Sequence, residues 1–269
     1  MGERPHRAGG FHRGRLPRLR HQRRRGGSAV RGRLLRGPRV PGGLGLGVLP
    51  GTLPAAAPDT LTAVKLSAIL PLPAEVAQQP ASVFVPVDGE PVLVRIVRAL
   101  AGIGDVLVVA DDRLTERVSG CLGELPVRVV AAGESPSTAD CLAAAAQHLQ
   151  QESVTHALVA DHRHPVVPDG LVQRVVAALS EGAELVVPVL PVTDTVKSVD
   201  AQGTILDTVD RSELQITQYP YGAAVPRLAD LQTVLGDAGL VTVAGDADAI
   251  PIDLPGDASL LEAIIACRR

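Results

Sequence analysis

The sequence predicts an α/β fold in which a mostly parallel, twisted sheet is covered by helices on both faces. From about Thr62 onward, short apolar runs alternate with segments of helical periodicity. Several of these runs are apolar almost throughout, which is typical of parallel strands that are buried on both faces. After residue 190 the alternation gives way to two β-rich runs joined by a turn, and this predicts a β-hairpin arm that projects from the α/β domain.

The strands and helices are predicted from their apolar spacing. Runs of four to seven mainly apolar residues predict strands at 64–70, 105–110, 127–131, 156–160, 184–189 and 241–244. Apolar residues three and four positions apart, or alanine-rich composition, predict helices at 92–100, 112–122, 137–150, 169–180, 228–235 and 259–267. Ser137 or Thr138 is a suitable N-cap for its helix, because a side-chain oxygen there can accept from an unpaired backbone N–H.

The hairpin is predicted over 193–199 and 204–209. Asp200-Ala201-Gln202-Gly203 joins its strands, and Gly203 can adopt the positive φ that such a turn needs. We place the whole arm at about 191–217.

Composition limits the possible classes of protein. The 269 residues are 46% apolar, so a sizeable core is available, and it is aliphatic because the chain has two Phe, two Tyr and no Trp. Cys121, Cys141 and Cys267 are odd in number and contain no CxxC pair, so neither a disulfide framework nor a zinc site is indicated. Proline and glycine interrupt the longest uncharged apolar stretch, 40–57, which therefore does not predict a membrane helix. We expect a protein of the cytoplasm.

The charge divides the chain into two parts. Residues 1–60 hold 13 Arg and two acids, whereas 61–269 hold 13 basic and 27 acidic residues, a net charge of −14. We interpret 1–60 as an unstructured extension, because Arg, Gly and Pro cannot bury enough apolar surface to offset the ordering entropy. A nucleic-acid-binding tail and an export signal are alternatives, although no clean apolar region precedes a cleavage site. The folded domain is predicted over 61–269.

The loop at 160–168 holds the densest group of reactive side chains. In an open parallel sheet, ligands bind outside the carboxyl ends of the strands, and this loop follows the strand at 156–160. Asp161 could hold Mg²⁺ through oxygen, and Arg163 could bind a phosphate with two hydrogen bonds. His162 and His164 also suggest zinc, without a pattern of further ligands to support it. The alternative is an exposed polar loop that ends at Pro165.

The hairpin carries Thr195, Lys197, Asp210 and Arg211, which by themselves are ordinary solvent-facing residues. In context, however, PVTDTVK at 191–197 and TVDR at 208–211 resemble the arm of the 2-C-methyl-D-erythritol 4-phosphate cytidylyltransferase family. Residues 158–168 also resemble that family's V-H-D-A-A-R-P block. The similarity spans about 66 to 265.

The resemblance implies a Rossmann-like nucleotidyltransferase fold and a homodimer formed through the arm. It implies that CTP, with Mg²⁺, reacts with methylerythritol phosphate to give a CDP-linked product and pyrophosphate in isoprenoid precursor synthesis. Thr195 and Arg211 take the positions that bind the substrate phosphate across the dimer, with Asp161 also at the substrate. Asp161 and Asp248 are the candidate Mg²⁺ ligands, and Lys197 and Arg163 the candidate catalytic cations.

The sequence departs from the family where the triphosphate should bind. The family opens with A-A-G-x-G-x-R, whose glycines let backbone N–H groups approach phosphate. Here the segment 70–80 reads LPLPAEVAQQP, and no Gly, Arg or Lys occurs between Ser67 and Asp88. His164 takes an arginine position, and Pro251 takes the position of a late lysine. We therefore expect weakened or absent transferase activity. The alternative is a pseudoenzyme that binds a phosphorylated ligand, or that dimerises with an intact enzyme and modulates it.

Overall fold

The computed structural model describes residues 19–21, 34–36, 65–229, 231 and 240–268. The chain divides into two compact units, which we describe separately: one combines 1–30 with 193–211, and the other combines 31–192 with 212–269. Most of the predicted extension 1–60 and of the predicted helix 228–235 lies outside the described residues. None of the described helices is long and apolar enough to cross a membrane.

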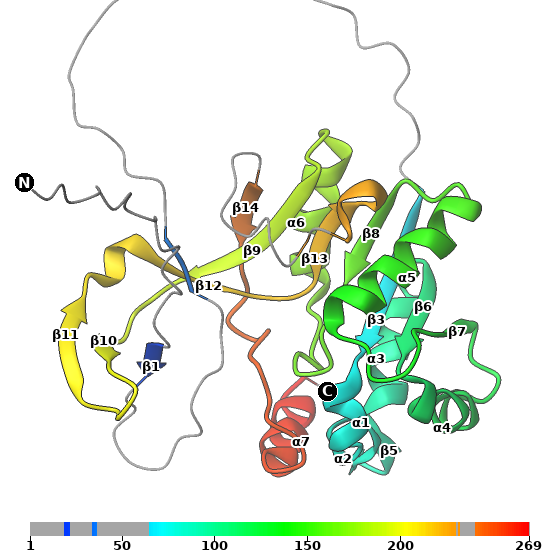
Figure 1. Cartoon of the computed structure of the whole chain (residues 1–269), viewed down its shortest axis with the longest axis horizontal. Coiled ribbons are helices and arrows are strands. Elements are labelled where there is room, and N and C mark those ends of the chain that lie inside the picture. The colour runs from blue at the N-terminus through cyan, green and yellow to red at the C-terminus, as the bar shows by residue number, and fades with distance from the viewer. Residues whose placement is uncertain (1–18, 22–33, 37–64, 230, 232–239, 269) are drawn as a thin grey trace, which may run out of the picture. The chain divides into compact units, whose positions relative to one another are not determined.

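The larger unit is built on a mixed, mostly parallel sheet, which confirms the predicted fold class (Figure 1). Its central strands β8, β3, β6 and β7 run parallel to one another, and β14 is parallel to β9. The strand order is β2-β12-β9-β13-β8-β3-β6-β7, with β14 beside β9. The strands are β2 (Leu34–Arg36), β3 (Leu66–Leu72), β6 (Asp105–Ala110), β7 (Val127–Ala131), β8 (His156–Val159), β9 (Leu185–Pro191), β12 (Leu214–Thr217), β13 (Tyr221–Ala224) and β14 (Leu240–Ala244). A separate short pair is β4 (Pro86–Val87) with β5 (Glu90–Pro91).

Strand β13 was not predicted, and it runs antiparallel between β8 and β9. Its four residues are small apart from Tyr221, so they show no apolar pattern that would indicate a strand. Gly222 lets helix α6 pack directly on this strand. A Cβ atom at Gly222 would lie 2.6 Å from Cγ1 of Val175 and 3.0 Å from Cδ1 of Leu179.

Helices cover both faces of the sheet, because alternate residues of a strand point to opposite sides. Leu70 packs in a cluster with α3 and α4, whereas its neighbour Ile69 packs in a cluster with α5. The helices are α1 (Ala74–Gln78), α2 (Ala81–Phe84), α3 (Val92–Ala101), α4 (Asp112–Leu122), α5 (Thr138–Gln151), α6 (Asp169–Ser180) and α7 (Ala258–Ala266), with 3-10 turns η1 (Arg211–Glu213) and η2 (Val225–Arg227).

Ser137 is the N-cap of α5, as predicted. Its hydroxyl accepts from the backbone N–H of Asp140 at 3.2 Å, and the Asp140 carboxylate accepts from the backbone N–H of Ser137 at 2.8 Å. This reciprocal pair satisfies two N–H groups at the helix end. We expect Ser137→Ala to lower the free energy of unfolding by about 1 kcal/mol, measured by urea denaturation. Ser119→Ala, at an exposed position inside α4, is the control and should change it by less than about 0.5 kcal/mol. An equal effect of the two variants would contradict the capping role.

The smaller unit contains the predicted hairpin. Its strands are β10 (Val196–Val199) and β11 (Ile205–Val209), which pair antiparallel, and β1 (Leu19–His21) pairs with β10. The Asp200 carboxylate accepts from the backbone N–H groups of Gln202 at 2.9 Å and Thr204 at 2.8 Å, and Gly203 has a φ of 88°. The turn chemistry thus follows the prediction, and the strands are shorter than predicted.

Candidate functional site

A cavity of about 130 Å³ lies at the carboxyl ends of β3 and β8, where the parallel sheet predicts a ligand site. Five segments of the larger unit form its walls: the end of β3 with α1 and α2, the start of α5, the loop after β8, the turn after β12, and the segment before α7. The lining residues are Pro71, Pro73, Glu75, Val76, Gln79, Ser82, Thr138, Val159, Ala160, Asp161, His162, Arg163, Tyr219, Ile252, Asp253 and Leu254.

Asp161 and Arg163 form an ion pair inside this wall. The Arg163 Nε donates to both carboxylate oxygens of Asp161, at 3.0 and 3.1 Å, and its Nη2 donates to Oδ2. The backbone N–H of Arg163 also donates to Oδ1 at 2.8 Å, so the loop turns back on its own aspartate. Two of the predicted site residues, Asp161 and Arg163, are therefore hydrogen-bonded to each other in the cavity wall.

The ion pair controls the protonation of Asp161. Burial raises the pKa of this carboxyl, but the hydrogen bonds and charge of Arg163, together with the charge of His162 once that ring is protonated at acid pH, outweigh burial and lower the pKa to about 2. The hydrogen bonds to Asp161 likewise raise the pKa of the Arg163 guanidinium. Both groups are therefore charged at pH 7, and the positive charge of Arg163 is largely neutralised by the carboxylate beside it.

The two histidines of the loop add no positive charge at neutral pH. Burial lowers the pKa of His162, and it lowers the pKa of His164 to about 4. The His164 ring lies 5.2 Å from the ring of Tyr219, and its Nδ1 has no hydrogen-bond partner among the described residues. A neutral imidazole thus stands at the position for which the resemblance in the sequence predicts an arginine.

The segment after β3 forms a helix in place of an open loop. Pro71 and Pro73 have no backbone N–H, and α1 begins immediately afterwards at Ala74. The N–H of Ala74 donates to the carbonyl of Pro136 at 2.8 Å, and those of Val76 and Ala77 donate to the carbonyl of Pro73. These donors are engaged within the protein and do not point to a ligand.

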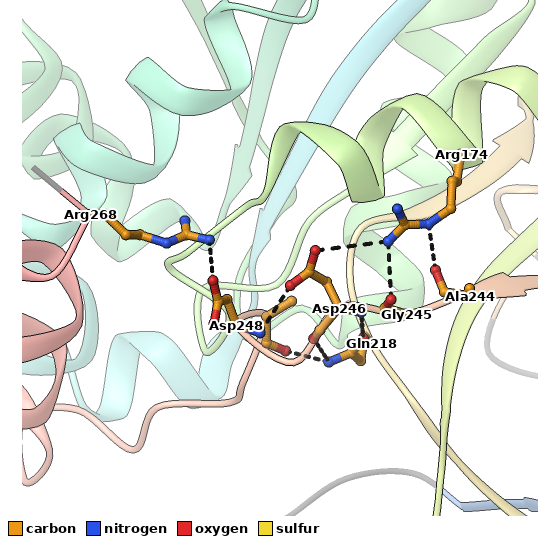
Figure 2. Close-up of polar contacts among 8 residues, drawn as sticks. Arg174, Gln218, Ala244, Gly245, Asp246, Asp248 and Arg268 are labelled. Carbon is orange, nitrogen blue, oxygen red and sulfur yellow. Dashed lines mark hydrogen bonds and ion pairs between the residues drawn. The ribbon is translucent and has the colours of Figure 1, made fainter.

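Asp248 lies in the loop after β14, which Figure 2 shows. Its carboxylate accepts from Arg268 Nη2 at 2.9 Å, and it does not line the cavity.

The buried side chain of Gln218 holds the loop after β14. Its Nε2 donates to the carbonyls of Asp246 at 2.7 Å and Ala249 at 2.9 Å, and its Oε1 accepts from the Asp246 N–H at 2.7 Å. From the other side Arg174 donates to the carbonyls of Ala244 and Gly245. A few residues later the backbone N–H of Ile252 reaches the carbonyl of Arg163 at 2.7 Å, so this loop leads directly into the cavity wall.

The side chains do not fit a resident metal ion. Both oxygens of Asp161 accept from Arg163, and Asp248 is paired with Arg268. Across the described part of the chain, no three His, Cys, Asp or Glu side chains gather closely enough to hold an ion. Mg²⁺ commonly binds through one or two carboxylates and the phosphates of a substrate, so an ion at this cavity would have to arrive with its own phosphate ligands.

The remaining predicted site residues lie on the hairpin of the smaller unit. Lys197 donates to the hydroxyl of Thr208, Arg211 donates to the carbonyl of Thr193, and Thr195 is exposed. Phosphate binding by Thr195 and Arg211, and catalysis by Lys197, stay predictions.

Sequence reasoning missed several residues of the cavity wall. Ser82 and 252–254 reach the wall only through the fold, and nothing in their local sequence marks them. Tyr219 follows β12, which was not predicted as a strand of the sheet, so its approach to the cavity could not be inferred. The one available signal was that Tyr219 is one of only two tyrosines in the chain.

Comparisons with known proteins find relatives that cover most of the chain. Residues 75–266 match the family model described as 2-C-methyl-D-erythritol 4-phosphate cytidylyltransferase. A protein of that name from Saccharopolyspora erythraea is 36% identical over 201 residues, which cover 68% of this chain and 90% of the relative. Another, from Nocardia farcinica, is 37% identical over 203 residues, covering 68% and 84%.

Solved structures of the same kind share the fold. The crystal structure of a 4-diphosphocytidyl-2C-methyl-D-erythritol synthase aligns with a TM-score of 0.62 at 22% identity, over 75% of this chain and 99% of that chain. The 2-C-methyl-D-erythritol 4-phosphate cytidylyltransferase from Thermus thermophilus aligns with a TM-score of 0.57 at 24% identity, over the same shares.

Proposed function

The chain belongs to the 2-C-methyl-D-erythritol 4-phosphate cytidylyltransferase family, and from this premise we propose that it is a member whose nucleotidyl transfer is strongly weakened or lost. The family reaction joins CTP and methylerythritol phosphate with release of pyrophosphate. The substrate phosphate attacks the α-phosphorus of CTP, and negative charge spreads over the reacting phosphoryl oxygens. Catalysis of this type depends on positioning and on positive charge at those oxygens.

The proposal rests on the small positive charge of the cavity wall. Among the described residues that line the cavity, Arg163 is the only side chain with a positive charge at pH 7, and its Nε and Nη2 both donate to the carboxylate of Asp161. Glu75 adds a carboxylate to the wall, in the segment for which the resemblance implies a cradle of glycines. Removing one preorganised donor from such a centre costs about 3 to 4 kcal/mol of transition-state stabilisation, or 100- to 1000-fold in rate. The resemblance implies that this chain lacks several such donors, and the effects of losing several are not additive.

The remaining residues would act as follows in any residual reaction. Arg163 would bind the phosphates only after leaving Asp161, so substrate binding would have to break the ion pair. Thr195 and Arg211 would bind the phosphate of methylerythritol phosphate, contributed across a homodimer formed through the hairpin. Members of the family generally depend on a divalent metal, and Mg²⁺ arriving with CTP would neutralise phosphate charge.

A pyrophosphate-release assay tests the proposal. With CTP, Mg²⁺ and methylerythritol phosphate, we expect kcat/KM to be at least about 1000-fold lower than for the Saccharopolyspora erythraea relative, which is the positive control. Calorimetry should show no saturable binding of CTP with Mg²⁺. A kcat/KM within tenfold of the relative would overturn the proposal.

A second function is association with an intact member of the family. The exposed side chains of Ile205 and Leu206, 52% and 65% accessible, give strand β11 of the hairpin an apolar surface that favours pairing with another chain. Mixing the protein with the intact relative should then give a heterodimer by light scattering and a changed rate of pyrophosphate release. An unchanged mass and rate would exclude this function.

A further inference from the structure

We infer that strands β1 and β2 block the association of this protein with a second copy of itself, because they occupy strand edges of the hairpin arm. The inference rests on the proposed function, which has the phosphate-binding residues of the arm act across a homodimer. It adds a regulation of that dimer, in the form of an autoinhibitory contact within each chain.

The predicted arm at about 191–217 contains β10, β11 and β12, and two of these pair with strands from near the start of the chain. In the smaller unit, β1 is hydrogen-bonded to β10 (Figure 1), and Arg20 at its centre lies opposite Lys197 in the register. In the larger unit, β2 is hydrogen-bonded to β12, and Leu35 at its centre lies opposite Gln215. Two stretches of the same extension therefore pair with the arm, each in its own unit.

These pairings make interior strands of β10 and β12. β10 has β1 on one side and β11 on the other, and β12 lies between β2 and β9. An edge strand presents a row of unpaired backbone N–H and C=O groups with which another chain can pair. Because β1 and β2 already use these groups, a second copy has to displace them before it can pair with β10 or β12. Among the described strands, β11 pairs with β10 alone, so its other edge is outside this block.

The position of β1 links the block to the predicted substrate residues. β1 pairs with 196–198, a stretch that includes Lys197 and directly follows Thr195. A partner subunit that receives these side chains from the arm has to approach the same stretch of β10. Phosphate binding by the arm across a dimer therefore depends on the release of β1.

The block is short enough to be displaced. β1 and β2 have three residues each, whereas the mean strand has about five to six. A strand of the same chain competes at a fixed local concentration, but a second copy competes in proportion to its own concentration. Only the fraction of molecules with free edges can associate, and the apparent affinity for a second copy is reduced by that fraction.

Sedimentation equilibrium of the full chain tests the block through the double variant Arg20→Pro with Leu35→Pro. Proline has no backbone N–H and disrupts the middle of a strand, so both pairings should open. We expect the dissociation constant for self-association to fall at least about tenfold, because the fraction of molecules with free edges rises. Two controls should leave this constant unchanged: Ser28→Pro, which adds a proline between β1 and β2 in the sequence, and Arg20→Gln, which removes the charge and keeps the N–H.

Hydrogen exchange followed by mass spectrometry examines the same contact in the unaltered protein. When the protein is diluted until it is monomeric, the backbone amides of 196–199 and 214–217 should be protected, because β1 and β2 cover them. At the same dilution, both segments should exchange faster in the double variant. The amides of β6, which lies between β3 and β7, should exchange equally slowly in both proteins and show that the variant is folded.

An unchanged dissociation constant in the double variant would contradict the inference. Rapid exchange of 196–199 and 214–217 in the unaltered monomer would already contradict it, whatever the variants do. The pyrophosphate-release assay tests the proposed function separately. If the dissociation constant does not change, the inference is wrong and the proposed function stands. If the unaltered protein releases pyrophosphate as fast as the relative does, the proposed function is wrong, and the dissociation constants still decide the inference.

Discussion

Replacing Gly245 with alanine is expected to lower the free energy of unfolding by about 3 kcal/mol. A Cβ atom at this position would lie 2.2 Å from Oε1 of Gln218, 2.9 Å from Cγ of Leu190 and 3.0 Å from the backbone carbonyl of Val189. The backbone carbonyl cannot move without disturbing β9. The buried Gln218 side chain could move only by giving up its three hydrogen bonds to the loop at 246–249.

Urea denaturation of Gly245→Ala measures this effect, with Gly120→Ala as the matched control. Gly120 lies in α4, and nothing stands within 4 Å of a Cβ added there. The control should therefore gain about 0.5 to 1 kcal/mol, because alanine loses less backbone entropy than glycine in a helix. A Gly245→Ala variant within about 0.5 kcal/mol of the original protein would show that the loop adapts easily and that Gln218 does not hold it.

Replacing Asp161 with asparagine is expected to lower the free energy of unfolding at pH 7 by about 2 kcal/mol. Breaking a buried ion pair typically costs more, about 3 to 5 kcal/mol, but the side chain of Arg163 is 45% exposed and water can partly replace its partner. The lowered pKa of Asp161, about 2, gives a similar value, since each pKa unit corresponds to about 1.4 kcal/mol. Asp105→Asn, at an exposed acid of β6, is the control and should change stability by less than about 0.5 kcal/mol.

The stability difference between the original protein and Asp161→Asn is expected to depend on pH. Folding lowers the pKa of Asp161 from 3.8 to about 2, so its contribution to stability is fully present above pH 3.8 and is lost as the pH falls through about 2. The difference between the original protein and Asp161→Asn should therefore shrink over this window. A difference that stays constant down to pH 2 would mean that the ion pair does not set the pKa of Asp161.

The sequence by itself determined the fold class and most of its elements. The helices 112–122 and 169–180 and the strands 105–110 and 127–131 match the structure to the residue. Each has strong apolar periodicity or a continuous apolar run, and such signals are local, so they can be read without the fold. The turn at Asp200 and the N-cap at Ser137 were also local, because each depends on bonds between residues a few positions apart.

Only the tertiary structure decided how the reactive side chains are used. Asp161 and Arg163 were singled out as ligands of metal and phosphate. They are only two positions apart, but the burial of Asp161 and the place of the ion pair in the cavity wall follow from the fold. Asp248 was singled out as a metal ligand, yet it meets Arg268, which follows α7 and lies 20 positions away in the sequence. Ser82, Tyr219 and Asp253 come from three distant segments and meet only at the carboxyl edge of the sheet. Periodicity reports which face of an element is buried, whereas a site depends on which elements lie side by side, and long-range packing alone fixes that arrangement.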